Sequence, residues 1–368
     1  MIDVLHLIGS EVSDFYADLS RLYARDCLSA TQDPERYRFH IAYVRPGGTW
    51  CFPADLSDTA LATAESLDLE QATEVIRSRA IDLMVPQMFC VPGMTTYRAL
   101  FDRLGVPYLG NPPAVMAMGA NKAQARDVVA LAGVDVPPGE LLSATDQPSL
   151  APPVVVKPVD ADNSIGVSLV SYVDQYNDAL ASAFAHSRQV LVETFVSLGR
   201  EVRCGVIETN EGLVCLPLEE YAMDAATKPI RALDDKIAKG DDEQPYLVAK
   251  AAERAWIVKP TDPITTAVWG AALKCHAALG CRDYSLFDFR VDPDGRPWFL
   301  EASLYCSFAR QSVLVLMAEA AGLPLKTFFD QAVQRRLAEA THPLQIDEVS
   351  DLAARPPHAL ALPRHQVV

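Results

Sequence analysis

Strand and helix signals alternate along the first 110 residues, and this alternation constrains the fold more than any other feature of the sequence. Three apolar runs are typical of buried strands, and three amphipathic segments are typical of helices. The strands are expected at 2–9, 38–45 and 81–86, and the helices at 11–27, 69–79 and 95–104. Such an order predicts a parallel sheet with helices on both of its faces.

Length, charge and cysteine content exclude several classes of protein. A chain of 368 residues predicts two or three domains, each with its own core. No apolar run approaches the ~20 residues that span a bilayer, and no signal peptide precedes the first strand, so we expect a cytoplasmic protein without a membrane partner. A net charge of −16 disfavours nucleic acid as a partner. The eight cysteines form no CxxC pair, and most are expected to be buried packing thiols.

Breaks in the pattern divide the chain. Asn111-Pro112-Pro113 ends the alternation, and the segment 222–262 is polar and longer than a connection needs to be, as disordered loops and lids are. The predicted class is α/β, with an α+β C-terminal part. We expect an N-terminal domain at 1–113, a central domain at 114–193, a C-terminal domain at 194–335 with a lid at 222–262, and a tail at 336–368.

The segment DYSLFDFRVDPDGRPWFLEASLY predicts a β-hairpin that carries two acids. A two-residue turn at Asp294-Gly295 would set Asp288 opposite Glu301, with Cβ atoms ~5 Å apart. Opposed like charges destabilise a hairpin unless a hard cation such as Mg²⁺ lies between them. A solvated surface pair is the alternative, and a three-residue turn with a bulge would shift the register by one residue.

Two lysines stand where a purely structural role is unfavourable. Lys122 lies in the first turn of the helix capped by Asn121, where the helix dipole disfavours a cation. Lys157 ends the strand run Val154-Val155-Val156, where an unpaired ammonium is costly. An anionic ligand would explain both, although each lysine alone is more often a surface residue. The loop Asp160–Gly166 that follows, with Asn163 and Ser164, could cover phosphates, but taken alone an ordinary hairpin loop is the better explanation.

A pair of glutamates brackets the segment ETFVSLGRE. Glu193 and Glu201 could accept from an adenine amino group and ribose hydroxyls, while backbone groups of Phe195 and Val196 bond the base edge. Salt-bridged structural glutamates are the alternative. The histidines show no metal-ligand spacing, and no GxSxG motif is present, so covalent catalysis is not favoured.

Taken in this order, these segments resemble the D-alanine–D-alanine ligase branch of the ATP-grasp family over roughly residues 2–333. The resemblance implies three domains, with ATP and Mg²⁺ held between the central and C-terminal ones. It implies nucleotide binding by Lys122, Lys157, Asn163, Ser164, Glu193 and Glu201, metal binding by Asp288, Glu301 and Ser303, catalytic roles for the lid lysine Lys236 and for Ser164, and substrate contacts by Glu11 and Ser312.

The acceptor side departs from that branch. Leu286 stands where the branch has an arginine, Ser303 where it has an asparagine, and PQMFCVPGMTTYRALF where it has His-Gly and Glu-Asp-Gly. The segments PQMFCVPGMT, KPVDADNS, CLPLEEY and LEASLYCSFA resemble the MysD-type ligases of mycosporine-like amino acid biosynthesis. A hydroxyl is a poorer magnesium ligand than an amide carbonyl, so a second ion would be weakly held.

That resemblance implies coupling of serine, threonine or glycine to mycosporine-glycine through a phosphorylated ring oxygen, giving an imine. Arg310, beside Ser312, is the expected contact for a substrate carboxylate, with a surface salt bridge as the alternative. Two other functions stay open: a D-alanine–D-alanine or other dipeptide ligase, and a regulatory protein that binds nucleotide without chemistry. The expected partners are small-molecule substrates and, from the family, a second copy in a homodimer.

Overall fold

The alternating N-terminal segments form one sheet in the computed structural model, which describes residues 1–161, 164–231, 237–239, 245–247 and 254–341. The sheet has the order β3-β2-β1-β4. Its strands are β1 (Ile2–Gly9), β2 (Tyr37–Val44), β3 (Trp50–Cys51) and β4 (Leu83–Pro86). The parallel pairing of β2, β1 and β4 confirms the predicted sheet, and the two-residue antiparallel strand β3 was not predicted.

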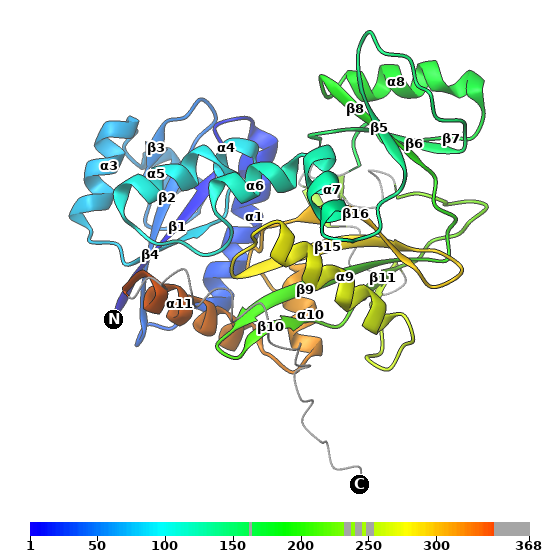
Figure 1. Ribbon diagram of the computed structural model, residues 1–368. Helices are drawn as coiled ribbons and strands as arrows, with labels where there is room; N and C mark the ends of the chain where they lie inside the picture. Colours follow the sequence, from blue (N-terminus) through cyan, green and yellow to red (C-terminus); the bar gives the residue numbers. More distant parts are fainter. Residues whose placement is uncertain (162–163, 232–236, 240–244, 248–253, 342–368) are drawn as a thin grey trace.

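Helices cover both faces of this sheet. One face packs on α3 (Leu69–Ser78) and α5 (Thr96–Leu104) through Leu5, Leu7, Ile76 and Phe101. The other face packs on α1 (Asp14–Thr31) and on α11 (Leu325–Thr341), the last described helix (Figure 1). The short helices α2 (Asp58–Thr63) and α4 (Val91–Met94) were not predicted. Helix α11 therefore completes the N-terminal core, and it includes residues 336–341, which the sequence placed in the tail.

A second sheet is antiparallel throughout and has the order β5-β8-β6-β7. Its strands are β5 (Gly139–Ser143), β6 (Val154–Pro158), β7 (Ser168–Val170) and β8 (Gln189–Thr194). The 3-10 turn η1 (Val173–Gln175) leads into α8 (Tyr176–Phe184), which packs on Val154, Val156, Val190 and Val192. Because strand side chains alternate, the intervening residues face the opposite way, toward the rest of the molecule.

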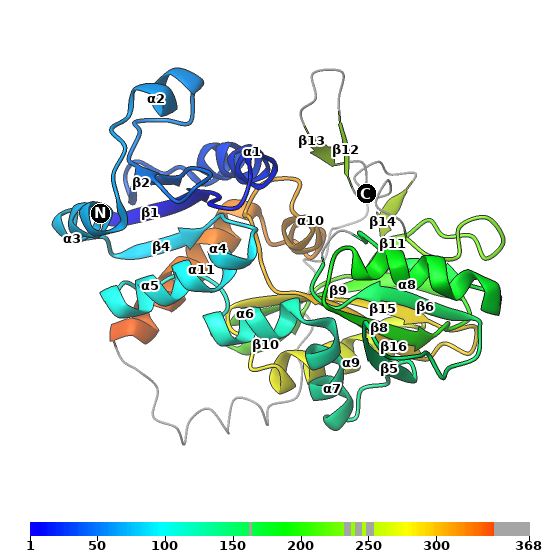
Figure 2. The same ribbon diagram turned by 90° about the horizontal axis from the view of Figure 1, so that it is seen from above.

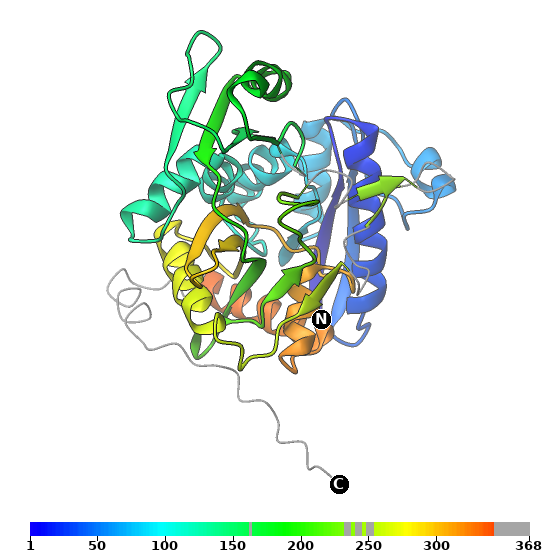
Figure 3. The same cartoon turned by 90° about the vertical axis from the view of Figure 1, so that its right-hand side faces the viewer.

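The third sheet has six strands in the order β14-β11-β9-β15-β16, with β10 beside β9. They are β9 (Arg200–Thr209), β10 (Gly212–Cys215), β11 (Glu219–Tyr221), β14 (Ala255–Ile257), β15 (Tyr284–Val291) and β16 (Pro297–Ser303). Figures 2 and 3 show the second sheet stacked over this one, with the N-terminal sheet to the side. The short strands β12 (Ile237–Lys239) and β13 (Pro245–Leu247) pair only with each other among the described strands.

Three helices cover one face of the six-stranded sheet. They are α6 (Pro113–Ala120), α7 (Lys122–Leu131) and α9 (Thr265–Ala278), whose apolar side chains pack on residues such as Cys204 and Phe287. The sequence assigned α6 and α7 to the central domain, whereas their core contacts are mostly with this C-terminal sheet. The remaining helix, α10 (Val313–Ala320), packs near Ile207 and Leu286 on the other face.

The cysteine prediction is confirmed, since all eight cysteines are free and buried. No helix within the described residues is long and apolar enough to cross a membrane.

Candidate active site

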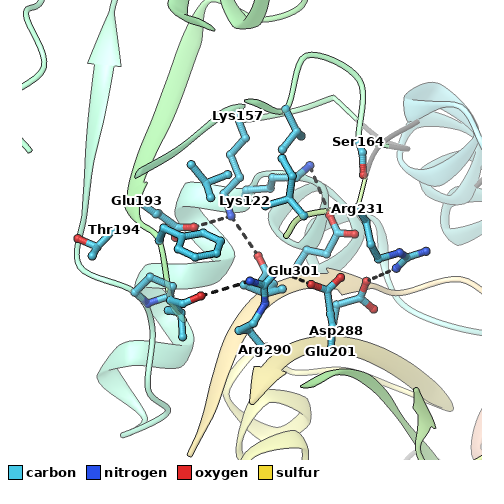
Figure 4. Close-up of a pocket in the computed structure, with 17 residues that line it drawn as sticks. Lys122, Lys157, Ser164, Glu193, Thr194, Glu201, Arg231, Asp288, Arg290 and Glu301 are labelled. Carbon is cyan, nitrogen blue, oxygen red and sulfur yellow. Dashed lines mark hydrogen bonds and ion pairs between the residues drawn. The ribbon is translucent and has the colours of Figure 1, made fainter. Parts of the chain in front are cut away.

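A pocket of about 740 Å³ lies between the two antiparallel sheets (Figure 4). The upper wall comes from the face of β6 and β8 that α8 leaves uncovered, where Lys157 and Glu193 alternate with the buried valines. The lower wall comes from β9 and β15, whose charged side chains alternate with core residues such as Val202 and Phe287. Strand periodicity therefore aims charged groups from both sheets into one space.

This pocket brings together nine residues that the sequence singled out. They are Lys122, Lys157, Ser164, Glu193, Phe195, Val196, Glu201, Asp288 and Glu301. They come from the N-terminus of α7, from both antiparallel sheets and from the loop before β7. Their individual roles remain predictions, but their convergence excludes the scattered surface positions that the sequence left open.

The two lysines are held by carboxylates of the protein. Lys157 is 6% exposed, and its Nζ lies 2.6 Å from Glu193 Oε2. Glu193 also receives Arg126 Nε at 3.2 Å, so it is salt-bridged, as the alternative for this residue proposed. Lys122 follows the Asn121 cap, donates to the carbonyl of Ala161, and lies 3.8 Å from Glu301 Oε2. The ammonium groups thus point inward, where an anion can compete for them.

The hairpin β15–β16 sets Asp288 opposite Glu301, as predicted, but by a different route. The turn is not the predicted two-residue one: Val291 pairs with Pro297, and Asp292 accepts the N–H of Gly295 and donates to the carbonyl of Arg296. A register shift between Asp288 and Phe289 then compensates for the longer turn. The longer turn and the bulge shift the register in opposite directions, so Asp288 still lies opposite Glu301 and both carboxylates face the pocket.

Sequence reasoning missed the arginines that accompany these acids. Arg203 is the cross-strand partner of Asp288 and binds it in bidentate fashion, with Nε at 2.7 Å and Nη2 at 3.2 Å. Arg290 is the cross-strand partner of Glu201, with Nη2 at 2.6 Å. Each arginine follows an acid by two residues on its own strand, so it shares that acid's face. This i, i+2 spacing of opposite charges was the signal available in the sequence.

Besides Arg203, Asp288 has a second arginine nearby, Arg231, which lies in the described first part of the predicted lid segment. Arg231 Nη1 lies 3.5 Å from Asp288 Oδ2, and its guanidinium stacks 3.5 Å from the ring centroid of Tyr221. Burial raises the pKa of Tyr221 well above its usual value. Burial opposes the charge of Arg203, but Asp288 and neighbouring groups outweigh it and hold the pKa of Arg203 above its usual range. The Arg203 guanidinium therefore stays charged beside Asp288.

Backbone groups of Phe195 and Val196, which follow β8, already form hydrogen bonds within the protein. The N–H of Phe195 donates to the carbonyl of Pro153 at 3.0 Å, and the carbonyl of Val196 accepts from Arg290 at 3.2 Å. The Arg290 guanidinium lies 5.4 Å from the ring centroid of Phe195. The Phe195 N–H is therefore taken, whereas the Phe195 carbonyl, the Val196 N–H and the second lone pair of the Val196 carbonyl can still meet a base edge.

A second cavity, with about 1030 Å³ of open space, adjoins the first at Lys122 and Glu301. Ser303 lines this cavity and not the first pocket. Much of the remaining lining is apolar or aromatic: Tyr16, Phe89, Val91, Met94, Met116, Leu304 and Tyr305. Phe89 and Tyr305 are in ring contact, with centroids 5.4 Å apart.

Three predicted substrate residues line neither cavity. Glu11 accepts the hydroxyl of Tyr97 at 2.8 Å, and Ser312 Oγ lies 3.8 Å from Cys306 Sγ. Arg310 is half exposed and pairs with Asp26 of α1, which is the surface salt bridge given as its alternative. The predicted residues Asn163 and Lys236 lie outside the described part of the chain.

The opposed carboxylates suit a metal ion that is shared with a phosphate-bearing ligand. Asp288 and Glu301 supply hard oxygen donors of the kind that Mg²⁺ prefers, and Mg²⁺ commonly takes one or two carboxylates plus phosphates and water. Within residues that the structure describes, no group of three or more His, Cys, Asp or Glu side chains could hold an ion by itself. The residues present therefore fit a magnesium–nucleotide site better than an all-protein metal cage.

Comparisons with known proteins agree with this geometry. Residues 140–334 match the family described as D-ala D-ala ligase C-terminus. The D-alanine–D-alanine ligase of Mycobacterium tuberculosis is 31% identical over 276 residues, covering 73% of this chain and 71% of that protein. The corresponding ligase of Mycolicibacterium smegmatis is 27% identical over 369 residues, covering 90% and 96%.

Solved structures show the same fold. The VanG D-Ala:D-Ser ligase from Enterococcus faecalis superposes with a TM-score of 0.73 at 20% identity, covering 90% of this chain and 98% of that one. The ATP complex of the D-alanine–D-alanine ligase from Bacillus anthracis gives a TM-score of 0.69 at 17% identity, covering 93% and 99%.

Proposed function

Because this chain belongs to the D-alanine–D-alanine ligase family and has its ATP-grasp fold, we propose that it is an ATP-dependent, ADP-forming ligase that joins two small molecules by a carbon–nitrogen bond. The observation that carries this proposal is the junction of two cavities at Lys122 and Glu301. The first, with Lys157 and Asp288 in its walls, suits a nucleotide, and the second suits the molecule that receives the phosphoryl group.

In this proposal different pocket residues contact different parts of the nucleotide. Lys122, Lys157 and Ser164 contact the phosphates, and Glu193 and Glu201 contact the base and the ribose. Asp288 and Glu301 hold Mg²⁺, which neutralises phosphate charge when it is bound. The protein contributes mainly position and fixed charge, since phosphoryl transfer needs little covalent help.

The relatives favour a dipeptide ligase as the first candidate. Their printed names support the ligation of D-alanine to D-alanine. In this candidate the carboxylate of one D-alanine becomes an acyl phosphate, and the amine of the second displaces phosphate. Lys122, at the junction of the cavities, is placed to offset the charge of the group in transit.

The apolar lining of the second cavity favours a second candidate. Phe89, Met94, Met116 and Tyr305 form a surface suited to a ring. Coupling serine, threonine or glycine to mycosporine-glycine fits this lining, because the ring oxygen would be phosphorylated in place of a carboxylate. None of the relatives named above carries that activity in its name.

One set of incubations separates these candidates. The protein is mixed with Mg²⁺, ATP and either D-alanine or mycosporine-glycine with serine, threonine and glycine, and ADP release and product masses are recorded. A D-alanyl-D-alanine product at rapid turnover supports the first candidate and contradicts the second. An imine product supports the second candidate and contradicts the first. If the protein binds ATP but forms no ADP with any substrate pair, it is a regulatory nucleotide-binding protein.

We also infer that the protein works in the cytoplasm as a homodimer, as the family resemblance implies. Light scattering coupled to size-exclusion chromatography tests the dimer, because one chain has a mass of 40.1 kDa.

A further inference from the structure

Among the described residues that line the first pocket, acidic and basic side chains pair with one another. Each of its four carboxylates lies within salt-bridge distance of a basic side chain that also lines the pocket. The pairs are Glu193 with Lys157 at 2.6 Å, Glu201 with Arg290 at 2.6 Å, Asp288 with Arg231 at 3.5 Å and Glu301 with Lys122 at 3.8 Å. A metal ion or a phosphate that enters alone competes with these pairs for one of their members.

Two arginines share Asp288, and they differ in how they are held. Arg203 is anchored in β9, where the backbone ladder sets it opposite Asp288 and both of its contacts have hydrogen-bond length. Arg231 lies on the loop after β11 and makes a longer ion pair. Its guanidinium stacks on the ring of Tyr221, and the Arg231 backbone itself belongs to no strand. Of the two, Arg231 is the cation that can exchange partners.

We propose that Arg231 neutralises Asp288 until a divalent metal takes its place, and that it then pairs with the nucleotide phosphates. The inference rests on the proposed function and assigns a positioning role to a residue at the described edge of the lid segment. It predicts that metal and nucleotide bind cooperatively. The metal replaces Arg231 as the partner of Asp288, and the nucleotide phosphates become the new partner of Arg231.

The physical reason lies in burial and charge. A metal ion at Asp288 would be repelled by both guanidinium groups, and the longer Arg231 pair would be the first to give way. The displaced Arg231, whose side chain is 6% exposed, would become a buried charge without a counter-ion, which is costly. Phosphate oxygens remove that cost, since they bind guanidinium groups strongly.

Binding of Mn²⁺, followed by electron paramagnetic resonance of the free ion, tests the proposal without an activity assay. The full chain is titrated alone and with ADP, next to Arg231→Met, which keeps an unbranched side chain against Tyr221 but no charge. We expect the wild type to bind Mn²⁺ weakly alone and tightly with ADP. Arg231→Met should bind the ion alone roughly tenfold more tightly than the wild type does.

Two further variants make the result specific. Since the chain carries a net charge of −16, surface sites also bind Mn²⁺, and Arg231→Met combined with Asp288→Asn should lose the gained affinity. Arg231→Lys keeps the charge and should resemble the wild type. Circular dichroism checks each fold, and Arg231→Gln replaces Arg231→Met if the latter is unfolded.

Equal Mn²⁺ affinity of the wild type and Arg231→Met, or a gain that survives Asp288→Asn, would overturn the proposal. A failure of the proposed function would give another result. In that case ADP would not strengthen Mn²⁺ binding to the wild type, whatever the Mn²⁺ affinity of Arg231→Met.

Discussion

The carboxylate of Asp288 has several charged neighbours. It accepts both contacts from Arg203, lies near Arg231 and faces Glu301 across the hairpin. Asp288→Asn should lower turnover about 10³-fold or more, because the amide is a poor magnesium ligand. It should also lower the free energy of unfolding by about 3 kcal/mol, since a buried ion pair loses its anion. ADP release and urea unfolding measure the two effects.

The exposed turn residue Asp294 provides the matched control. Asp294→Asn makes the same chemical change in the same hairpin and should leave both quantities near the wild type. If Asp288→Asn turned over ATP at the normal rate, the metal assignment would be wrong.

At this scale the sequence could predict residues whose neighbours are local or lie across a hairpin. The acids and lysines stand out because they interrupt apolar runs. Arg203 and Arg231 did not stand out, because their partner Asp288 lies more than fifty residues away in the chain. Pairing of β9 with β15 creates those contacts, and nothing within either strand specifies it.

Among the elements, α7 carries the clearest link between local stability and the site. The Asn121 side chain accepts the N–H of Gln124 at 3.0 Å, which fixes the first turn that presents Lys122. Asn121→Ala should cost about 1 kcal/mol of stability. It should also raise the KM for ATP more than it lowers kcat, because Lys122 would lose its fixed position. Asn121→Ser restores a cap and should recover both, and a normal KM in the alanine variant would contradict the link.

Element positions were predicted well where periodicity and stop signals coincide. Helix α5 ends at Gly105 with φ of 68°, a conformation that glycine adopts easily, as the sequence indicated. The β15–β16 turn was predicted wrongly, because Asp294-Gly295 suits a two-residue turn and the compensating bulge leaves no local signal. The packing of α6 and α7 on the C-terminal sheet depends on distant strands and could not be inferred from order along the chain.

For the whole molecule, the seam between the N-terminal sheet and α11 should make stability depend on pH through His6. The imidazole is fully buried against Phe39, which also contacts Phe329 of α11. Within the described residues neither ring nitrogen has a hydrogen-bond partner. Burial lowers the pKa of His6 from 6.5 to about 3, so the folded protein keeps the ring neutral where the unfolded chain protonates it.

Protonation of the unfolded chain below pH 6.5 therefore draws the equilibrium toward unfolding. The contribution should reach about 1.4 kcal/mol per pH unit between pH 6 and 3. His6→Leu, which keeps the site apolar and cannot titrate, should remove that part of the slope while leaving stability near neutral pH similar or higher. Urea unfolding of both proteins at pH 7.5, 6.0 and 5.0 measures it. Parallel curves for the two proteins would show that His6 finds a partner or stays protonated in the fold.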